Sequence, residues 1–324
     1  MSRPRDDGVV IGSLEPGLRN SIADVGVRVG HVTVEVTGVT ALVPPALPLP
    51  AGTAVLNGAG ELTGSLQIRE WGQLETPVYL TSTHAVGRVY EGAVQVALAA
   101  DPRVGVEEVV IPVVGECDDS WLSDARVAHV QPADVARAVD AATLDFEQGA
   151  VGAGAGMVCF HWKGGIGSAS RRAGDATVGV LVLSNFGAGE QLRVDGVPVG
   201  RLLAAHGAGP ADPAGSCIAV VATDAPLAPP QLERLARRAG LGLARTGSVA
   251  HHGSGEIFVA FATATSRSYE DSRLDPLFAA AVDATEEAVL CALWAAADTR
   301  GREGRVVPAL PRERVLELYR GRGR

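Results

Sequence analysis

Three nearly continuous apolar runs constrain the fold of this chain more than any other feature of its sequence. They span residues 177–185 (TVGVLVLSN), 217–223 (CIAVVAT) and 256–263 (EIFVAFAT). Successive apolar residues are typical of strands covered on both faces, because neighbouring strand residues point to opposite sides. Apolar helices predicted over residues 85–100, 230–239 and 276–297 can provide that cover. The sequence therefore predicts a layered α/β or α+β architecture.

Shorter signals add to the predicted order of elements. The apolar residues 109–114 predict a further strand, and Pro132 suits the first turn of another helix. Gly240 follows the helix predicted over residues 230–239. We expect it to cap that helix, because glycine readily adopts the left-handed conformation that ends many helices.

The composition narrows the class of protein. The chain has 47% hydrophobic and 20% charged residues, a mix typical of globular proteins. Its formal net charge of −9 argues against binding to nucleic acid, which requires a basic surface. We recognise no secretory signal, and the apolar run 288–297 is far shorter than the roughly 20 residues of a membrane-spanning helix. We therefore expect a cytoplasmic protein without a membrane partner.

Several common catalytic and binding motifs are missing from the sequence. Lys163, the only lysine, does not stand in a phosphate-binding loop, and the glycine-rich stretches lack the dinucleotide fingerprint. A serine-hydrolase G-x-S-x-G motif surrounds neither Ser216 nor Ser254. The four cysteines form no C-x-x-C pair, which predicts buried, reduced thiols, and no H-E-x-x-H is present. We expect neither a metal nor a cofactor.

The junction between Gly215 and Ser216 is the candidate that remains. Ser216 follows a glycine and enters the second apolar run. On these residues alone, the ordinary interpretation is a turn serine. However, Asn185 closes the first run, and Ser254 and Glu256 stand at the start of the third. Polar residues at the ends of three buried strands favour a functional site.

A series of motifs in a fixed order identifies a family. The motifs are residues 20–25 (NSIADV), 29–31 (VGH), 37–41 (TGVTA), 56–61 (LNGAGE), 74–77 (LETP), 83–87 (THAVG), 185–187 (NFG) and 222–226 (ATDAP). With them the chain resembles, nearly end to end, the DmpA family of L-aminopeptidase/D-esterase-amidases and β-aminopeptidases, also called P1 family peptidases. Such a series is far more specific than a single short motif.

The resemblance implies both a fold and a processing event. The fold is α/β, a four-layered αββα sandwich similar to that of N-terminal-nucleophile hydrolases, with residues 1–324 in a single domain. The precursor cleaves itself between Gly215 and Ser216 into a large chain, 1–215, and a small chain, 216–324. Ser216 is then the nucleophile of a serine aminopeptidase that acts on short peptides, amides or esters.

The chemistry of such a nucleophile follows from the residue itself. A serine hydroxyl is a weak nucleophile and needs a base. Cleavage gives Ser216 a free α-amine, whose ordinary pKa of about 7.7–8.0 suits a general base near neutral pH. No histidine is then required. Gly215 suits the cleavage step, because a residue without a Cβ allows unusual backbone angles and close approach.

By the same resemblance, four further residues have roles at the site. Asn185 helps to bind the oxyanion, Ser254 and Glu256 hold the nucleophile and its α-amine, and Glu116 receives the free amino group of the substrate. Each also has an ordinary structural interpretation. Asn185, Ser254 and Glu256 could be strand-end or turn residues, and Glu116 could be a solvated carboxylate.

The chain departs from the family pattern two residues after Glu116. Where relatives have Glu-x-Tyr, it reads Glu116-Cys117-Asp118. We expect the second carboxylate of Asp118 to make the substrate pocket more acidic and to alter the choice of substrate without abolishing activity. Residues 121–124 (WLSD) still resemble the family.

Two other functions stay open. An acyltransferase of the ornithine acetyltransferase type shares this general fold and self-cleavage, although its nucleophile is typically threonine. An unprocessed homologue without turnover would be a binding protein. The resemblance also implies a homo-oligomer of cleaved heterodimers, with tetramers among relatives. The sequence does not fix the substrate side chain or the preference for L-, D- or β-amino acids.

Overall fold

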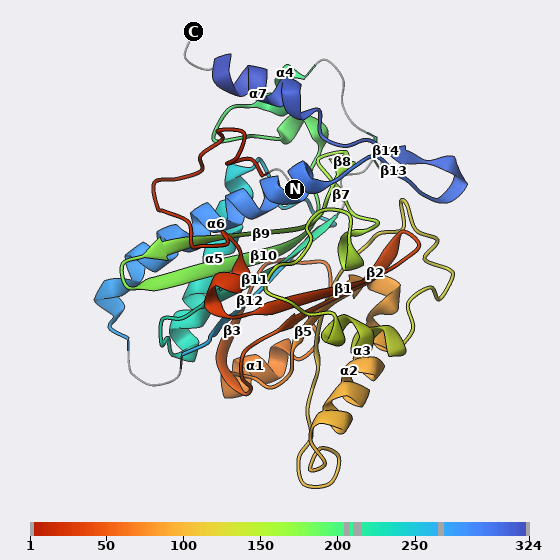
Figure 1. Ribbon diagram of the computed structural model, residues 1–324, viewed down its shortest axis with the longest axis vertical. Coiled ribbons are helices and arrows are strands. Elements are labelled where there is room, and N and C mark those ends of the chain that lie inside the picture. Colours follow the sequence, from red (N-terminus) through yellow and green to blue (C-terminus); the bar gives the residue numbers. More distant parts are fainter. Residues whose placement is uncertain (1–2, 204–207, 210–214, 265–268, 322–324) are drawn as a thin grey trace.

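Two β-sheets stacked face to face form the centre of the computed structural model, which describes residues 3–203, 208–209, 215–264 and 269–321 (Figure 1). The larger sheet has, in spatial order, β4 (Gln73–Leu74), β3 (Leu49–Gly58), β12 (Gly255–Ala262), β11 (Ser216–Thr223), β10 (Ala176–Asn185) and β9 (Gly165–Ala173). The smaller has β1 (Arg28–Val34), β2 (Thr37–Val43), β5 (Val78–Ser82) and β6 (Val113–Cys117). β11 and β12 pair in parallel, as do β5 and β6, and the other neighbours are antiparallel.

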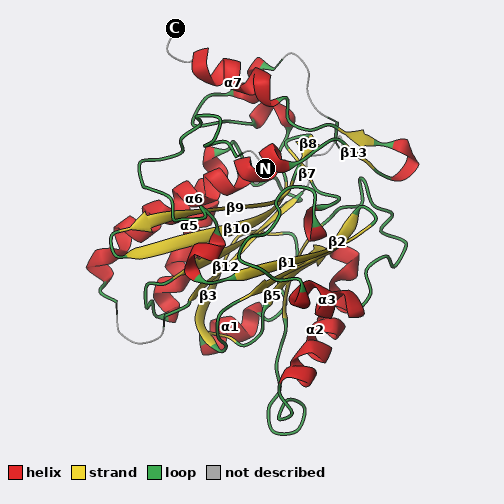
Figure 2. Ribbon diagram, viewed as in Figure 1, coloured by secondary structure: helices red, strands yellow, loops and turns green. Residues whose placement is uncertain are grey.

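Helices cover the outer face of each sheet, so that the layers follow the order α, β, β, α (Figure 2). The six-stranded sheet is covered by α5 (Pro229–Arg245) and α6 (Leu274–Ala295), and the four-stranded sheet by α2 (Val86–Ala100) and α3 (Ala133–Asp140). The smaller elements are α1 (Ser65–Trp71), α4 (Val199–Leu202), α7 (Arg312–Arg320) and the short strand pairs β7 (Val158–Cys159) with β8 (Trp162–Lys163) and β13 (Thr299–Arg300) with β14 (Val306–Val307). The αββα sandwich expected from the resemblance is confirmed.

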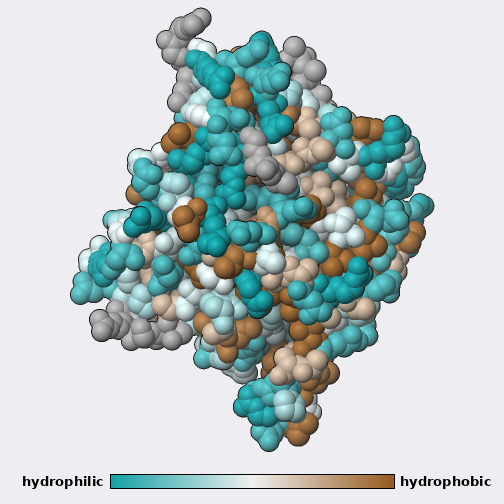
Figure 3. Space-filling model, in the orientation of Figure 1, coloured by the Kyte–Doolittle hydropathy of each residue, from teal (hydrophilic) through white to brown (hydrophobic). Residues whose placement is uncertain are grey.

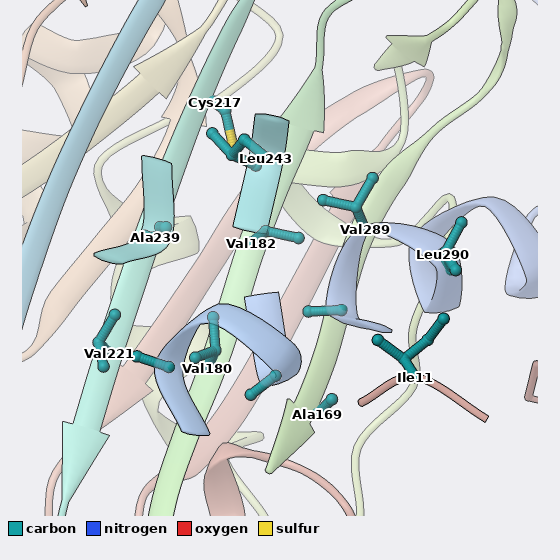
Figure 4. Packing of buried hydrophobic residues seen from close by; sticks show 14 of the residues in the cluster. Ile11, Ala169, Val180, Val182, Cys217, Val221, Ala239, Leu243, Val289 and Leu290 are labelled. Atoms are coloured by element: carbon teal, nitrogen blue, oxygen red, sulfur yellow. The ribbon is translucent and has the colours of Figure 1, made fainter. Parts of the chain in front are cut away.

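Hydrophobic clusters fill the spaces between these layers. The inter-sheet core, to which Leu181 and Ile218 belong, lies between the two sheets. The helix-side core lies between the six-stranded sheet and helices α5 and α6, and contains Val180, Cys217 and Leu243 (Figure 4). Side chains of β10 and β11 alternate between the two cores, as expected for strands that are covered on both faces.

The three apolar runs of the sequence form the central strands β10, β11 and β12, and two of the other predictions needed correction. Gly240 does not cap α5, which continues to Arg245. A Cβ at Gly242 would lie only 2.7 Å from the carbonyl oxygen of Val282, so a glycine within this helix allows the close approach of α6. The strand predicted over residues 109–114 begins only at Val113.

Exposed apolar side chains are scattered among polar ones, and several gather around α2 and the loop that follows it, at the lower end of Figure 3. Leu98, Val106 and Val109 are the most exposed of these. The four cysteines are buried and free, as predicted. Among the residues that the structure describes, no helix combines the length and the apolar character needed to cross a membrane.

Candidate active site

Ser216 and Asn185 lie opposite each other where β10 ends and β11 begins. The antiparallel ladder pairs them directly, and both side chains are buried. Because Cys217 points into the helix-side core, Ser216 faces the other side of the sheet. Leu183 and Ile218, the next paired residues on that side, belong to the inter-sheet core. The structure therefore brings these two predicted site residues together on one face.

The side-chain amide of Asn185 is held in one orientation. Its Oδ1 accepts a hydrogen bond from the backbone N–H of Val158 (2.8 Å), and its Nδ2 donates to the backbone carbonyl of Asp118 (2.8 Å). A backbone N–H can only donate, so it fixes which side of the amide carries the oxygen. Asn185 thus presents an NH₂ group at the site, with one N–H available beyond the bond to Asp118.

Gly215 is tightly enclosed by its neighbours. Its carbonyl oxygen accepts a hydrogen bond from the backbone N–H of Gly255 (3.1 Å). A Cβ at Gly215 would lie 1.9 Å from the carbonyl oxygen of Asn185, a distance that no side chain can adopt. The glycine is therefore required by the close approach of two backbone segments. Residues 210–214, which precede Gly215, lie outside the described residues.

Ser254 and Glu256 form a buried hydrogen-bonded pair beside Ser216. Glu256 lies opposite Cys217 in the parallel ladder, and Ser254 Oγ donates to Glu256 Oε1. Burial raises the pKa of the Glu256 carboxyl, and the bond from Ser254 opposes that rise. Within the part of the chain that the structure describes, Glu256 Oε2 has no hydrogen-bond partner. A buried carboxylate oxygen without a donor is costly and favours a cation next to it.

Glu116 is buried near the end of β6 and is not the solvated carboxylate of its ordinary interpretation. Its Oε1 accepts from the backbone N–H of Glu61 (2.9 Å), and its Oε2 accepts from Thr83 Oγ1. A methyl group at Gly60 would lie 3.0 Å from Glu116 Oε1 and 3.7 Å from Gly255 Cα, so Glu116 lies close to the start of β12. Burial raises the pKa of the Glu116 carboxyl.

A pocket of about 250 Å³ lies beside Asn185 and Gly215. Its other walls include Asp118, Trp121, His161, Arg302 and Arg305. Asp118 is exposed, and its carboxylate accepts bonds from the backbone N–H and the hydroxyl of Ser120, both 2.9 Å long. The side chains of two arginines therefore share this wall with the carboxylate of Asp118.

Several residues at the site were given no role from the sequence. Asn57 Nδ2 donates to the carbonyl oxygen of Ser254 (2.6 Å) and so holds the segment before β12, while Gly60 and Thr83 lie against Glu116. All three stand in motifs that carry the family resemblance, at residues 56–61 and 83–87. The motifs were therefore a signal for these residues. No comparable signal marked Arg302 or Arg305.

Lys163 has a structural position. It is fully buried, and its Nζ donates to the carbonyl oxygens of Gly154 (3.0 Å), Met157 (2.8 Å) and Gly164 (2.9 Å). An ammonium group has three N–H donors, and all three are used here. Lys163 therefore stabilises the backbone around β7 and β8, including Val158, whose N–H binds Asn185.

Comparison with known proteins places this chain in a family. The model of peptidase family S58 matches residues 20–307. Beta-peptidyl aminopeptidase BapA from Sphingosinicella microcystinivorans is 39% identical over 372 residues, covering 98% of this chain and 92% of that protein. Among solved structures, a Burkholderia sp. beta-aminopeptidase has a TM-score of 0.91 and 41% identity, with 98% of each chain covered.

A second solved structure extends the comparison to the fold class. The L-aminopeptidase D-Ala-esterase/amidase from Ochrobactrum anthropi has a TM-score of 0.93 and 35% identity, covering 100% of this chain and 99% of that one. It is described as a prototype for the serine aminopeptidases and a new variant of the Ntn hydrolase fold. The present chain is thus a hydrolase of the aminopeptidase class. It belongs to peptidase family S58, the DmpA family that its motifs resemble.

Proposed function

We propose that this chain is a self-processing serine aminopeptidase with Ser216 as its N-terminal nucleophile. The observation that carries the proposal is the place of Ser216 at the start of β11, paired with Asn185 and next to the buried carboxylate of Glu256. Hydrolysis of the Gly215–Ser216 bond would leave residues 1–215 and 216–324 as two chains. Strands of both would still share the six-stranded sheet, which explains how they stay together.

The surroundings of Gly215 suit the cleavage step. The Gly255 N–H already donates to the carbonyl oxygen that must accept negative charge, and such donors lower the barrier to acyl transfer. Ser216 Oγ bonds to the Gly215 carbonyl carbon while the peptide C–N bond breaks, and the hydroxyl proton passes to the departing nitrogen. Water then hydrolyses the ester, which restores the hydroxyl and leaves a carboxylate on Gly215.

Glu256 and Ser254 support the amine that this step releases. The new α-amine of Ser216 lies one residue along the ladder from Glu256, whose Oε2 has no partner among the described residues. A bond from the amine would satisfy that oxygen and fix the direction of the amine lone pair relative to Oγ. The same carboxylate favours the protonated amine, so activity requires a pH at which the neutral amine is populated.

Substrate hydrolysis repeats the same chemistry on an external acyl group. The α-amine removes the proton from Ser216 Oγ as Oγ attacks the substrate carbonyl, and it then passes the proton to the leaving amine. The free N–H of Asn185 Nδ2 donates to the oxyanion, an interaction typically worth about 3–4 kcal/mol. Water hydrolyses the acyl-enzyme ester and releases the N-terminal amino acid.

Glu116 provides the specificity for a free amino terminus. Its carboxylate is buried and held by Glu61 and Thr83, so an ammonium group can bind it with little loss of side-chain entropy. The names of the relatives point to β-amino acids among the N-terminal residues accepted. Asp118 replaces the neutral tyrosine of the family, and we propose that it changes the preferred substrate without stopping turnover.

Intact mass and a substrate panel test this function together. The parent should separate into two chains under denaturing conditions and hydrolyse at least one p-nitroanilide of glycine, L-Ala, D-Ala or β-Ala. Ser216→Ala should remain at 33.3 kDa and be inactive, whereas Ser272→Ala, at an exposed serine of the same segment, should behave as the parent. A protein that transfers acetyl from N-acetylornithine but hydrolyses no aminoacyl amide would instead be an acyltransferase.

We also propose that the cleaved heterodimer forms a homo-oligomer. A groove of about 650 Å³ between α1, α2 and the loop that follows α2 is lined mostly by apolar residues, among them Trp71, Val104 and Val109, with charged residues such as Arg103 and Glu108 beside them. Contiguous apolar surface of this kind is uncommon on monomers. Light scattering should give a mass several times that of one chain, and Val109→Glu should lower it. A monomeric parent would contradict this part of the proposal.

A further inference from the structure

The pocket beside Asn185 contains two arginines that the proposed catalytic steps do not use. Arg302 and Arg305 come from the turn between β13 and β14, far along the sequence from Asn185. Their side chains are largely covered, with exposed fractions of 23% and 31%. Charged groups that are withdrawn from water are usually paired with an opposite charge, and the partner of these two arginines is a carboxylate.

Contacts with the neighbouring loop hold both arginines in place. Arg305 Nη1 donates to the carbonyl oxygen of Trp121 (3.1 Å), and its guanidinium carbon lies 4.4 Å from the centre of the Trp121 ring. The backbone N–H of Arg302 donates to the carbonyl oxygen of Leu122 (2.7 Å). Groups that are oriented in advance lose less entropy when a ligand binds.

A carboxylate of the protein itself already bridges the two arginines. Glu303 accepts one bond from Arg302 (2.7 Å) and one from Arg305 (2.9 Å), each on a different carboxylate oxygen. The Glu303 side chain is 56% exposed. The two guanidinium groups are therefore spaced to donate one charge-assisted hydrogen bond to each oxygen of one carboxylate.

The Asp118 carboxylate on the pocket wall does not pair with either arginine. Its oxygens are bound instead by the backbone N–H and hydroxyl of Ser120. Among the described residues, the two guanidinium groups are thus paired with the single carboxylate of Glu303. A carboxylate in the pocket would compete with Glu303 for the arginines.

The position of the pocket relates it to the departing part of a substrate. Asn185, which we propose binds the oxyanion, is part of its wall, as is Gly215. Glu116, which we propose binds the amino group, is instead bonded to Glu61 and Thr83. A substrate whose amino group lies at Glu116 and whose carbonyl lies at Asn185 would extend its leaving group into the pocket.

We propose that this pocket binds the residue released by hydrolysis, and that Arg302 and Arg305 bind its free carboxylate in place of Glu303. The inference rests on the proposed aminopeptidase function and names its preferred substrate class, dipeptides with a free C-terminus. A volume of about 250 Å³ suits a single released residue rather than a long peptide.

The test compares substrates that differ only in the carboxylate. The aminoacyl group most active in the p-nitroanilide panel is joined to glycine and to glycinamide, and kcat/KM is measured for both and for the p-nitroanilide. Parent, Arg302→Gln, Arg305→Gln and Glu303→Gln enzymes are compared with Arg300→Gln, which removes the same charge from an exposed residue of β13. Intact mass confirms processing in each variant, and thermal unfolding confirms its folding.

The parent should favour the free acid over the amide by about tenfold or more in kcat/KM. Arg302→Gln and Arg305→Gln should each reduce that ratio about tenfold through KM, whereas the Arg300→Gln control should keep the parent ratio. Glu303→Gln should lower KM for the acid, because it removes the competing carboxylate. A parent active on p-nitroanilides but indifferent to the carboxylate, or arginine variants that keep the parent ratio, would overturn this inference alone. A parent inactive on all p-nitroanilides would overturn the proposed function itself.

Discussion

Replacing Gly215 by alanine should slow self-processing without changing the side chain of any proposed catalytic residue. The added Cβ would lie 1.9 Å from the carbonyl oxygen of Asn185, 2.9 Å from its carbonyl carbon and 3.0 Å from Phe186 Cα. All three are backbone atoms of a strand end that is paired with β11, so none can move aside as a flexible side chain would. Ordinary contacts begin at 3.4 Å. The backbone at residue 215 must therefore shift by more than an ångström.

That shift displaces the carbonyl that Ser216 Oγ must attack. A misplacement of about 1 Å in a reacting group costs on the order of 100-fold in rate, and overpacking of this kind destabilises a protein by about 1–3 kcal/mol. We expect Gly215→Ala to fold, with a lower melting temperature, and to process about 100-fold more slowly on a time course of denaturing gels. Gly321→Ala is the matched control, because a Cβ there meets nothing within 4 Å. Processing of Gly215→Ala at the parent rate would refute this explanation.

Three further substitutions test the site and its support. Asn185→Ala should lower kcat of the processed enzyme by about 10²–10³-fold, measured by aminoacyl p-nitroanilide hydrolysis, and an unchanged kcat would remove Asn185 from the oxyanion site. Glu116→Gln should raise KM for substrates with a free amine. Burial raises the pKa of Glu116, so kcat/KM of the parent should fall as the pH drops through that raised pKa. This acidic fall in kcat/KM should be absent from the pH profile of Glu116→Gln. Burial alone would raise the pKa of Glu287, but the Arg171 guanidinium and the hydrogen bonds from Arg5 and Asn20 lower it overall. The stability that Glu287 contributes is therefore present above its ordinary pKa and lost as the pH falls. Glu287→Gln should lower the free energy of unfolding, measured in urea near neutral pH, by about 3–5 kcal/mol and should reduce its dependence on acid pH. A change under 1 kcal/mol would contradict a structural role for the buried ion pair of Glu287 with Arg171.

The sequence was most informative where burial is continuous. The runs that form β10, β11 and β12 are covered on both faces, so nearly every position between their polar ends is apolar and the strands are evident without knowledge of their partners. The apolar residues 109–111 show the opposite case. Val109 is 78% exposed, and β6 begins only at Val113. An apolar run on the surface cannot be distinguished from a strand by its pattern alone.

The structural role of the glycines in α5 could not be predicted from the sequence, for a related reason. A glycine after a predicted helix can end it, but it can also allow another helix to approach. Gly242 does the second, because a Cβ there would lie 2.5 Å from the Cβ of Thr285 on α6. Gly240 likewise lies inside α5. Which of these applies depends on a contact with a segment over 40 residues away, and no local rule provides it.

The family motifs identified important positions but did not separate catalysis from support. Asn20 belongs to the first motif, yet its Nδ2 donates to Glu287 Oε1 (2.6 Å), and Glu287 forms a buried ion pair with Arg171. This network ties the N-terminal segment to α6 and β9. The motif at residues 56–61 instead surrounds Glu116. Only the arrangement in space shows which motif residues border the site, because the partners are distant in the sequence.

The central claim is that activity requires the amine released at Ser216. The most direct measurement follows freshly purified precursor by intact mass while aminopeptidase activity is assayed in the same samples. We predict that activity increases in proportion to the chain 216–324, and that N-terminal sequencing of this chain begins Ser-Cys-Ile-Ala. Full activity in a sample that is still a single 33.3 kDa chain would contradict the proposed mechanism.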